Sequence, residues 1–415
     1  MLRLKRRARA QLLLLREGSW HLRWILISCT LALAGFAGLS TNVPQWVQIT
    51  LGLISVALVV IDIRNHRAET RMTKFQPRTT EDFNSVIELL EGNPRCSVYN
   101  FRHGTLVLDT LVSEALNTEE FAAKTSKTAY TIPLQIRTMG NRYRRSRVQG
   151  NPNAYNEPVL GLASISTTGP APAMNTIEAY YWDHLATDQL AMVDVTFDDV
   201  PQTDLGRLLF VDRHGSLRDF ASSWLLNAIG VSVLAITTDG HFVVVMQSSN
   251  NDSAQGLYAP TGSGSLEPQD FDGQISLSAS QLLANGALRE AAEESAIAAE
   301  EVGAVFPLGF GRWLQKAAKP EAFFVAFLNI DSHAIKLKRI PNADRAYTSS
   351  SQPRRFKQED PADWQSASPT AMVGEEITNS MSLPLEACLA LLARAVERKD
   401  PRICSLLGPR FRTNS

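Results

Sequence analysis

Two long apolar stretches near the N-terminus constrain the fold of this chain more than any other feature. The first covers residues 24–39 and extends weakly to 43, and the second covers residues 43–63. A membrane-spanning helix needs about 20 mostly apolar residues, and the polar break Ser40-Thr41-Asn42 is typical of a tight turn. We therefore predict a transmembrane helical hairpin over residues 24–63. A cleaved signal peptide and the buried helices of a soluble fold are the alternatives, but the second stretch follows the first at once.

Basic residues flank this hairpin on both sides. Arg3, Lys5, Arg6, Arg7, Arg9, Arg16 and Arg23 precede it, Arg64, Arg67, Arg71 and Lys74 follow it, and the turn has no Lys or Arg. The positive-inside rule predicts a multi-pass protein of the inner (cytoplasmic) membrane with both termini in the cytoplasm. The lipid bilayer is then a partner. Because Gly35, Gly38 and Gly52 permit close helix packing, a homo-oligomer formed through the hairpin stays open beside plain anchoring.

The charge balance and the cysteines argue against several classes of protein. The chain has 41 Lys and Arg against 42 Asp and Glu, a formal net charge of -1. A protein that binds nucleic acid over its whole length is usually basic, so we expect no nucleic-acid partner. Cys29, Cys96, Cys388 and Cys404 are scattered without metal-ligand spacing, so neither a structural zinc site nor a disulfide framework is predicted.

The chain divides into five predicted segments. They are a basic N-terminus (1–23), the hairpin (24–63), a linker and helix (64–95), a mixed α/β accessory region (96–222) and a C-terminal domain (223–415). In the accessory region we predict strands at 105–108 and 190–197 and a helix at 111–117. The basic run 142–147 is open between contact with phosphates or anionic lipid and a solvated loop. The aromatic run 180–184 is open between core and a surface that covers a ligand.

The C-terminal domain carries the most informative pattern. A buried-type strand at 230–238, the turn Asp239-Gly240 and a strand at 241–246 predict a β-hairpin. A glycine-containing loop (256–267) and a helix (278–299) follow. On that helix Glu290, Glu293 and Glu294 share one face. Their mutual repulsion favours a hard divalent cation, Mg²⁺ or Mn²⁺. Arg289, four residues before Glu293, is expected to pair with it and orient the ligands.

Arg289-Glu290-Ala291-Ala292-Glu293-Glu294-Ser295-Ala296-Ile297 resembles the second half of the motif of the Nudix hydrolase superfamily. The resemblance covers about residues 230–407. It implies an α+β fold, a Nudix-like α/β/α sandwich with a mixed sheet, that binds a nucleotide-type small molecule. It also implies metal ligands Glu290, Glu293 and Glu294, catalytic roles for Glu293 and Glu294, and substrate binding by Gly262, Gly264 and Glu267.

Three departures from the motif accompany the resemblance. Ala296 stands where the family has Gly, and Ala291 is a small occupant of an aliphatic position. Asp270 follows Gly264 where the family has Glu, and the long distance from Asp270 to Arg289 implies an insertion. Because Ala favours helix over Gly by about 1 kcal/mol, we expect the helix to run past Ile297. The polar residues 270–278 are expected to form a surface loop.

The last part of the chain adds further candidates. Arg312 and Trp313 are substrate-binding candidates, although core packing is the simpler role for Trp313. A long loop is predicted at 339–362, then Glu375 and Glu376 as candidates for a catalytic base from a late loop, and a helix at 383–398. Three functions remain open: a membrane-anchored hydrolase of a nucleoside diphosphate linked to another group, a nucleotide-sensing membrane effector that binds without hydrolysis, and a membrane-tethered scaffold.

Overall fold

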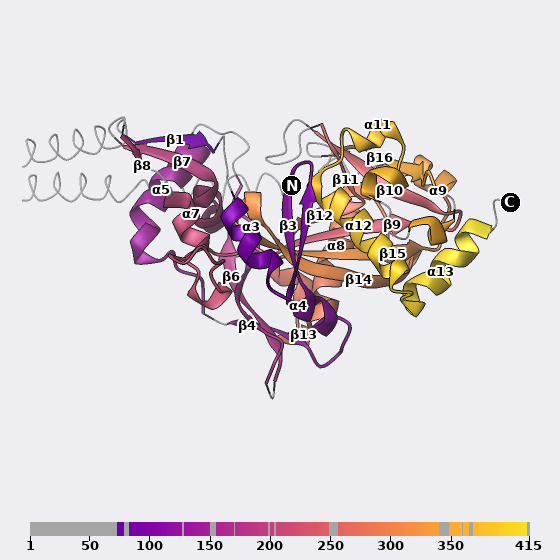
Figure 1. Cartoon of the computed structure of the whole chain (residues 1–415), viewed down its shortest axis with the longest axis horizontal. Coiled ribbons are helices and arrows are strands. Elements are labelled where there is room, and N and C mark those ends of the chain that lie inside the picture. Colours follow the sequence, from indigo (N-terminus) through magenta and orange to yellow (C-terminus); the bar gives the residue numbers. More distant parts are fainter. Residues whose placement is uncertain are drawn as a thin grey trace, which may run out of the picture.

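A computed structural model of the chain describes most residues from Thr73 to Arg412 (Figure 1). The described ranges are 73–78, 83–126, 128–149, 155–169, 171–197, 200–202, 205–248, 256–339, 348–358, 360–364 and 368–412. The predicted transmembrane hairpin (24–63) and the basic N-terminus (1–23) lie outside them. None of the described helices is long and apolar enough to cross a membrane. The prediction of a multi-pass inner-membrane protein is corrected accordingly, because no described element supports it.

The fold is α+β and is organised around a nine-stranded mixed sheet. Its strands run in the order β11-β10-β9-β15-β14-β3-β2, with β12 paired to β9 and β16 paired to β10. The bounds are β2 Cys96–Phe101, β3 Gly104–Asp109, β9 Gly230–Ile236, β10 His241–Gln247, β11 Tyr258–Pro260, β12 Gly262–Ser265, β14 Val302–Trp313, β15 Lys319–Leu328 and β16 Thr348–Arg355. β9 and β15 are parallel, and the other pairs are antiparallel. The predicted hairpin at 230–246 is therefore present, and the predicted loop at 339–362 contains β16.

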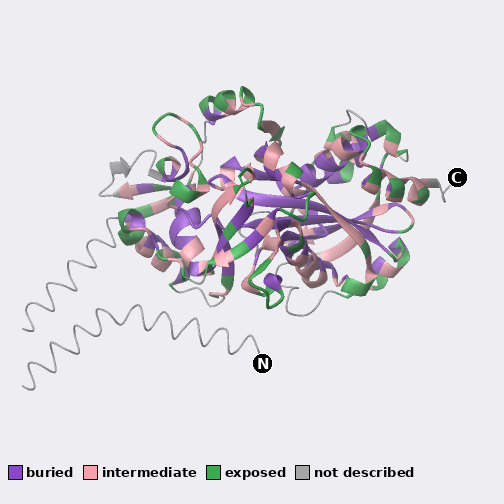
Figure 2. Cartoon of the chain, turned by 90° about the horizontal axis from the view of Figure 1, so that it is seen from below, coloured by how far each residue is buried: buried purple, intermediate pink, exposed green. Residues whose placement is uncertain are grey.

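Helices cover both faces of this sheet. The longest in the C-terminal half are α8 Ala279–Ser295 and α12 Leu383–Glu397. Along β9, Val231 and Val233 belong to the core on the α8 side, and Leu234 and Ile236 belong to the core on the α12 side. The strand is apolar without interruption because both of its faces are buried, as the purple strands at the centre of Figure 2 show.

Two smaller sheets accompany the nine-stranded sheet among the described residues. One has the order β13-β4-β6-β5 and the other β1-β7-β8. Their bounds are β1 Thr73–Pro77, β4 Ala122–Ser126, β5 Pro158–Ser166, β6 Ala173–Tyr180, β7 Val193–Phe197, β8 Val200–Gln202 and β13 Ser276–Ser278. Strands are exchanged across residue 222: β3 pairs with β14 of the large sheet, and β13 pairs with β4 of the accessory region. The accessory region and the C-terminal half therefore share the nine-stranded sheet and the β13-β4-β6-β5 sheet.

The remaining helices are mostly short. They are α3 Asn84–Glu91, α4 Thr110–Ala115, α5 Leu134–Val148, α6 Tyr181–His184, α7 Leu205–Phe210, α9 Ser332–Leu337, α10 Pro369–Met372, α11 Glu375–Thr378 and α13 Pro401–Arg412, with a π-helical turn at Leu185–Gln189. The basic run 142–147 is part of α5 and is not a loop. The predicted strand at 190–197 begins only at Val193, after a 3-10 turn.

Helix α8 begins and ends at identifiable signals. Ser278 is its N-cap, because the Ser278 hydroxyl accepts a hydrogen bond from the Gln281 N–H at 3.1 Å. It ends at Ser295, and Ala296 follows in a left-handed conformation with φ 55°. The expectation that the helix runs past Ile297 is therefore wrong. Reversal at Ala296 turns the chain back so that the Ile297 side chain is buried in the core, and this burial outweighs the helix preference of Ala.

Candidate functional site

The candidate site forms where β12 lies directly on α8. The two glycines of β12 permit this approach, since a Cβ on Gly262 would overlap the backbone of Ala291 and a Cβ on Gly264 would overlap the carboxylate of Glu290. Between them, the Ser263 N–H donates to Glu294 Oε2 at 2.9 Å. The glycines and two of the predicted carboxylates therefore come together as a packed layer of backbone and side chain.

The Arg289 guanidinium lies at the centre of the acidic residues. Its Nε is 2.9 Å from Asp270 Oδ1, and its Nη1 is 2.9 Å from Glu290 Oε1. Nη1 is also 3.6 Å from both Glu267 Oε1 and Glu293 Oε2, and Nη2 donates to the Ser265 carbonyl at 2.8 Å. The predicted pairing with Glu293 is present, but the shortest ion pairs of Arg289 are to Asp270 and Glu290.

The carboxylates differ in their access to water. The side chain of Glu290 is 12% exposed and that of Glu293 is 46% exposed. Burial raises the pKa of Glu290 to about 7, against the lowering effect of Arg289. Burial also raises the pKa of Glu267 to about 6, and Glu157 of the accessory region adds to that rise by its charge. A desolvated carboxyl group favours its neutral form. The raised pKa values of Glu290 and Glu267 indicate that the positive charge of Arg289 does not offset burial and the repulsion between the carboxylates.

The metal-ligand prediction needs correction. In the part of the chain that the structure describes, no group of three His, Cys, Asp or Glu side chains is arranged to hold a metal ion. The physical reason is that Arg289 lies between the carboxylates of Glu290 and Glu293, while Glu294 is engaged by the Ser263 N–H. Glu290, Glu293 and Glu294 are therefore close together without forming a preformed metal site.

Other predicted residues lie in different surroundings. Arg312 is partly buried in β14, where its Nη1 donates to the Arg218 carbonyl at 2.8 Å, and burial lowers the pKa of Arg312 to about 10. The buried Trp313 follows it. Glu375 and Glu376 are exposed in α11, and Glu376 Oε1 is 2.8 Å from Arg354 Nη1 of β16. These contacts join other parts of the molecule rather than the α8 cluster.

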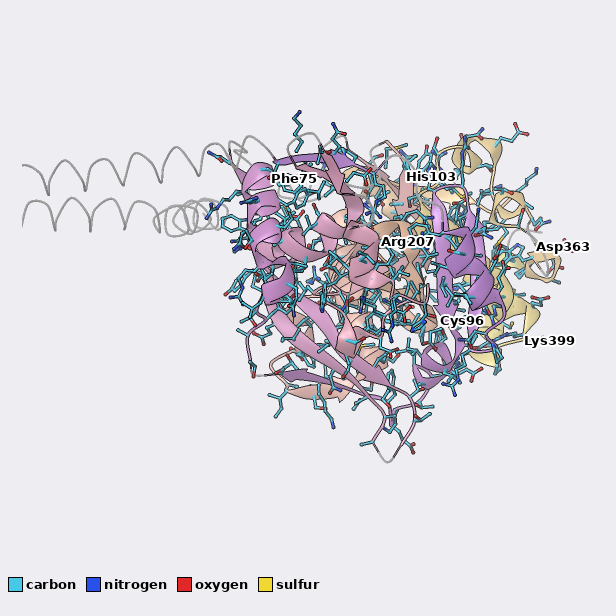
Figure 3. The ribbon with its side chains drawn as sticks, turned by 60° about the vertical axis from the view of Figure 1, so that its left-hand side comes forward. Phe75, Cys96, His103, Arg207, Asp363 and Lys399 are labelled. Atoms are coloured by element: carbon cyan, nitrogen blue, oxygen red, sulfur yellow. The ribbon has the colours of Figure 1, made fainter. Side chains whose placement is uncertain are left out.

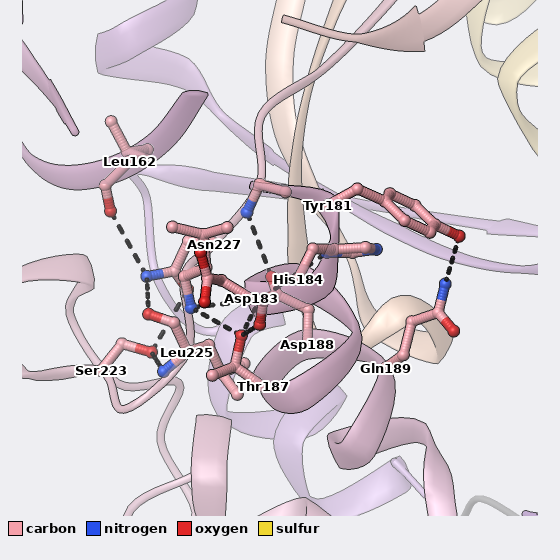
Figure 4. A network of polar contacts seen from close by, with 12 residues as sticks. Leu162, Tyr181, Asp183, His184, Thr187, Asp188, Gln189, Ser223, Leu225 and Asn227 are labelled. Carbon is pink, nitrogen blue, oxygen red and sulfur yellow. Dashed lines mark hydrogen bonds and ion pairs between the residues drawn. The ribbon is translucent and has the colours of Figure 1, made fainter. Parts of the chain in front are cut away.

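The sequence analysis missed a buried polar network in the accessory region (Figure 4). Asp188 Oδ2 accepts from the Leu226 N–H at 3.1 Å and from the Thr187 hydroxyl at 2.8 Å, and Asp188 Oδ1 accepts from the Ala228 N–H at 3.1 Å. Burial raises the pKa of Asp188, but the hydrogen bonds and His184, whose Nδ1 is 3.8 Å away, bring it below its usual value. This carboxylate fixes the chain just before β9. The available signal was the short polar run Thr187-Asp188-Gln189 between apolar residues.

Comparison with known proteins does not identify the chain. No protein-family model matches it, and no curated protein matches it. Among solved structures it is similar to the crystal structure of DR0079 from Deinococcus radiodurans, with 12% identity and a TM-score of 0.22 over 31% of this chain and 67% of that one. A likeness at this TM-score carries no argument. The assignment to the Nudix hydrolase superfamily is therefore wrong on these findings, and the chain is not placed in that family.

Proposed function

We propose that the C-terminal half is a hydrolase for a phosphoanhydride, specifically a nucleoside diphosphate linked to another group. One observation carries the proposal: Glu267, Asp270, Glu290 and Glu293 surround a single guanidinium, that of Arg289, where β12 meets α8. Such an excess of carboxylates favours a cationic partner. The α8–sheet–α12 sandwich is the rigid support that we propose for this site.

A divalent cation, Mg²⁺ or Mn²⁺, would arrive with the phosphates of the substrate in this proposal. Mg²⁺ is commonly bound by one or two carboxylates together with substrate phosphates. Glu293 and Glu267 fit this role, because both carboxylates have exposed surface beside Arg289. The cation would supply charge neutralisation and polarise a phosphoryl oxygen. The Ser263 N–H of β12 donates to Glu294, and Gly264 of β12 packs on the Glu290 carboxylate, which Arg289 holds in place. These two carboxylates therefore position the helix against β12.

A binding-only function is the second candidate. The central position of Arg289 favours it, because the guanidinium already neutralises part of the charge that a cation would neutralise. A nucleotide sensor needs the ligand pocket but not the turnover. Measured binding of a nucleotide without product formation would favour the sensor.

The test is turnover of a panel of nucleoside diphosphate derivatives by the full chain, with and without Mg²⁺. We expect cation-dependent release of a nucleoside monophosphate. Glu293→Gln should lower turnover by about 10²–10⁴-fold, because it removes a carboxylate charge from a cation that is worth several kcal/mol of transition-state stabilisation, and should leave the fold intact because the side chain is half exposed. Glu300→Gln, at an exposed position just after α8, is the control. Equal turnover in both variants would remove Glu293 from the proposal.

A further inference from the structure

A cleft of about 860 Å³ lies between α3 and the β2–β3 hairpin, away from the α8 cluster. One wall is α3, with Glu88 and Glu91. The other wall is the turn end of the hairpin, with His103 at the turn, whereas Cys96, at the far end of β2, does not line the cleft (Figure 3). Gln315, just after β14, also lines the cleft. Its volume is in the range of small-molecule sites.

The hairpin side of the cleft presents hydrogen-bond donors. The Thr105 N–H donates to Gln315 Oε1 at 2.7 Å, and the Thr105 hydroxyl donates to Asn100 Oδ1 at 3.0 Å. Because Thr105 engages both amide oxygens, the NH₂ groups of Gln315 and Asn100 are left for other acceptors. The donor-rich wall requires a ligand with carbonyl or carboxylate oxygens.

A buried indole lies behind this wall, outside the lining of the cleft. Trp313 is only 9% exposed, and its Nε1 has no hydrogen-bond partner among the described residues. Gly104, which lines the cleft, faces that nitrogen closely: a Cβ on Gly104 would lie 2.8 Å from Trp313 Nε1. Gly104 therefore lets the hairpin pack directly on the indole, and the indole closes the cleft from behind at this wall.

The α3 side has the opposite character. Glu88 and Glu91 are exposed, acceptor-only side chains three residues apart, and so on one face of the helix. Arg102 is held at the rim, since its Nη1 donates to the Asn379 side-chain oxygen at 3.0 Å. Burial, together with the charge of Arg102, lowers the pKa of His103. The cleft is therefore negative along α3 and donor-rich along the hairpin.

We propose that this cleft binds a small amphoteric ligand, a free amino acid or short peptide. Its carboxylate or carbonyl oxygens accept from Asn100 and Gln315, and its ammonium group lies against Glu88 and Glu91. A purely anionic ligand would meet the two carboxylates of α3, and a purely cationic one would leave the donors unsatisfied. The proposal does not depend on the function of the α8 cluster.

Calorimetric titration of the full chain tests this with a panel of free amino acids and dipeptides. Each is compared with its N-acetyl and C-amide derivatives. We expect at least one free member to bind at millimolar concentration or below, and both derivatives to bind at least about fivefold more weakly, since each loses a charge-assisted contact. Binding by the N-acetyl form as tight as by the free form would overturn the proposal, as would the absence of binding by every member.

A variant pair locates the site. Glu88→Gln combined with Glu91→Gln removes the negative wall at exposed positions, so the fold is retained, and the affinity for the bound member should fall by about tenfold. Glu114→Gln, an exposed change in α4, should leave the affinity unchanged. Equal affinity in the double variant and the wild type would refute the assignment to this cleft.

Discussion

Replacing Glu290 by Gln should stabilise the protein at high pH and leave its stability at low pH almost unchanged. In the folded chain the Glu290 carboxyl is packed under Gly264 and is 12% exposed. Its pKa is raised to about 7 by burial, from a usual value of 4.5. Ionising it in place therefore opposes folding. Gln has the same shape, carries no charge and keeps an oxygen that accepts from Arg289 Nη1.

The sign and size follow from proton linkage. Between pH 4.5 and about 7 the folded protein holds a proton at Glu290 that the unfolded chain has lost, so stability falls as pH rises through this window. Each pKa unit corresponds to about 1.4 kcal/mol. Above pH 7 the ionised Glu290 therefore lowers the free energy of unfolding by about 3 kcal/mol. Glu290→Gln removes this penalty. The difference between variant and wild type should therefore grow from near zero at pH 4.5 to about 3 kcal/mol at pH 8.

Urea unfolding of the full chain at a series of pH values, with EDTA present, measures this difference. EDTA keeps a bound cation from neutralising Glu290. Glu300→Gln, an exposed change just after the same helix, should give a difference that does not vary with pH. A Glu290→Gln variant that is less stable than the wild type at pH 8 would show that the Arg289–Glu290 pair outweighs the burial of the charge.

Two further substitutions and one control test local features by thermal unfolding. Ala296→Gly should stabilise the chain by about 0.5–1 kcal/mol, because Ala296 has φ 55° and Gly adopts the left-handed region without steric cost. Ala390→Gly, in the interior of α12, should instead destabilise it by about 1 kcal/mol. Asp188→Asn should destabilise it by about 1.5–3 kcal/mol, because the amide NH₂ must face one of the N–H donors of Leu226 and Ala228. An unchanged melting temperature would contradict the argument from backbone strain for Ala296→Gly, and the argument from lost hydrogen bonds for Asp188→Asn.

Local sequence patterns predicted the hairpin at 230–246 and helix α8 because both depend on signals within a few residues. The Asp239-Gly240 turn and the Ser278 cap act over short range. The predictions that were wrong concern features that depend on residues far away in the sequence. Ala disfavours φ 55° on steric grounds, and two features of the folded chain accompany it: the N–H groups of Ala296 and Ile297 donate to the carbonyls of Ala292 and Ala291, and Ile297 is buried in the assembled core. Residues 276–278 form β13 because β4, far away in sequence, supplies the partner strand.

The candidate site was predictable in its members but not in its arrangement. The spacing of Glu290, Glu293 and Glu294 on one helix is fixed by helix geometry. The position of Arg289 is not, because Asp270, one of its two shortest ion-pair partners, comes from the 3-10 turn before the helix. The guanidinium therefore lies inside the cluster, which is why a ligand set read from spacing alone did not give a metal site.

The exchange of strands predicts that residues 223–415 do not fold alone. Without the preceding chain, β14 loses β3, and β13 loses β4. Leu106 and Leu108 of β3 are buried in the core under α12, and each contributes about 1.5–3 kcal/mol by burial. Removal of both also exposes the apolar surface that they cover. Hydrogen exchange of the fragment 223–415 should show little protection in β14, whereas a fragment 73–415 should retain it. Cooperative unfolding of the shorter fragment at the midpoint of the longer one would refute this reasoning and make the C-terminal half an independent domain.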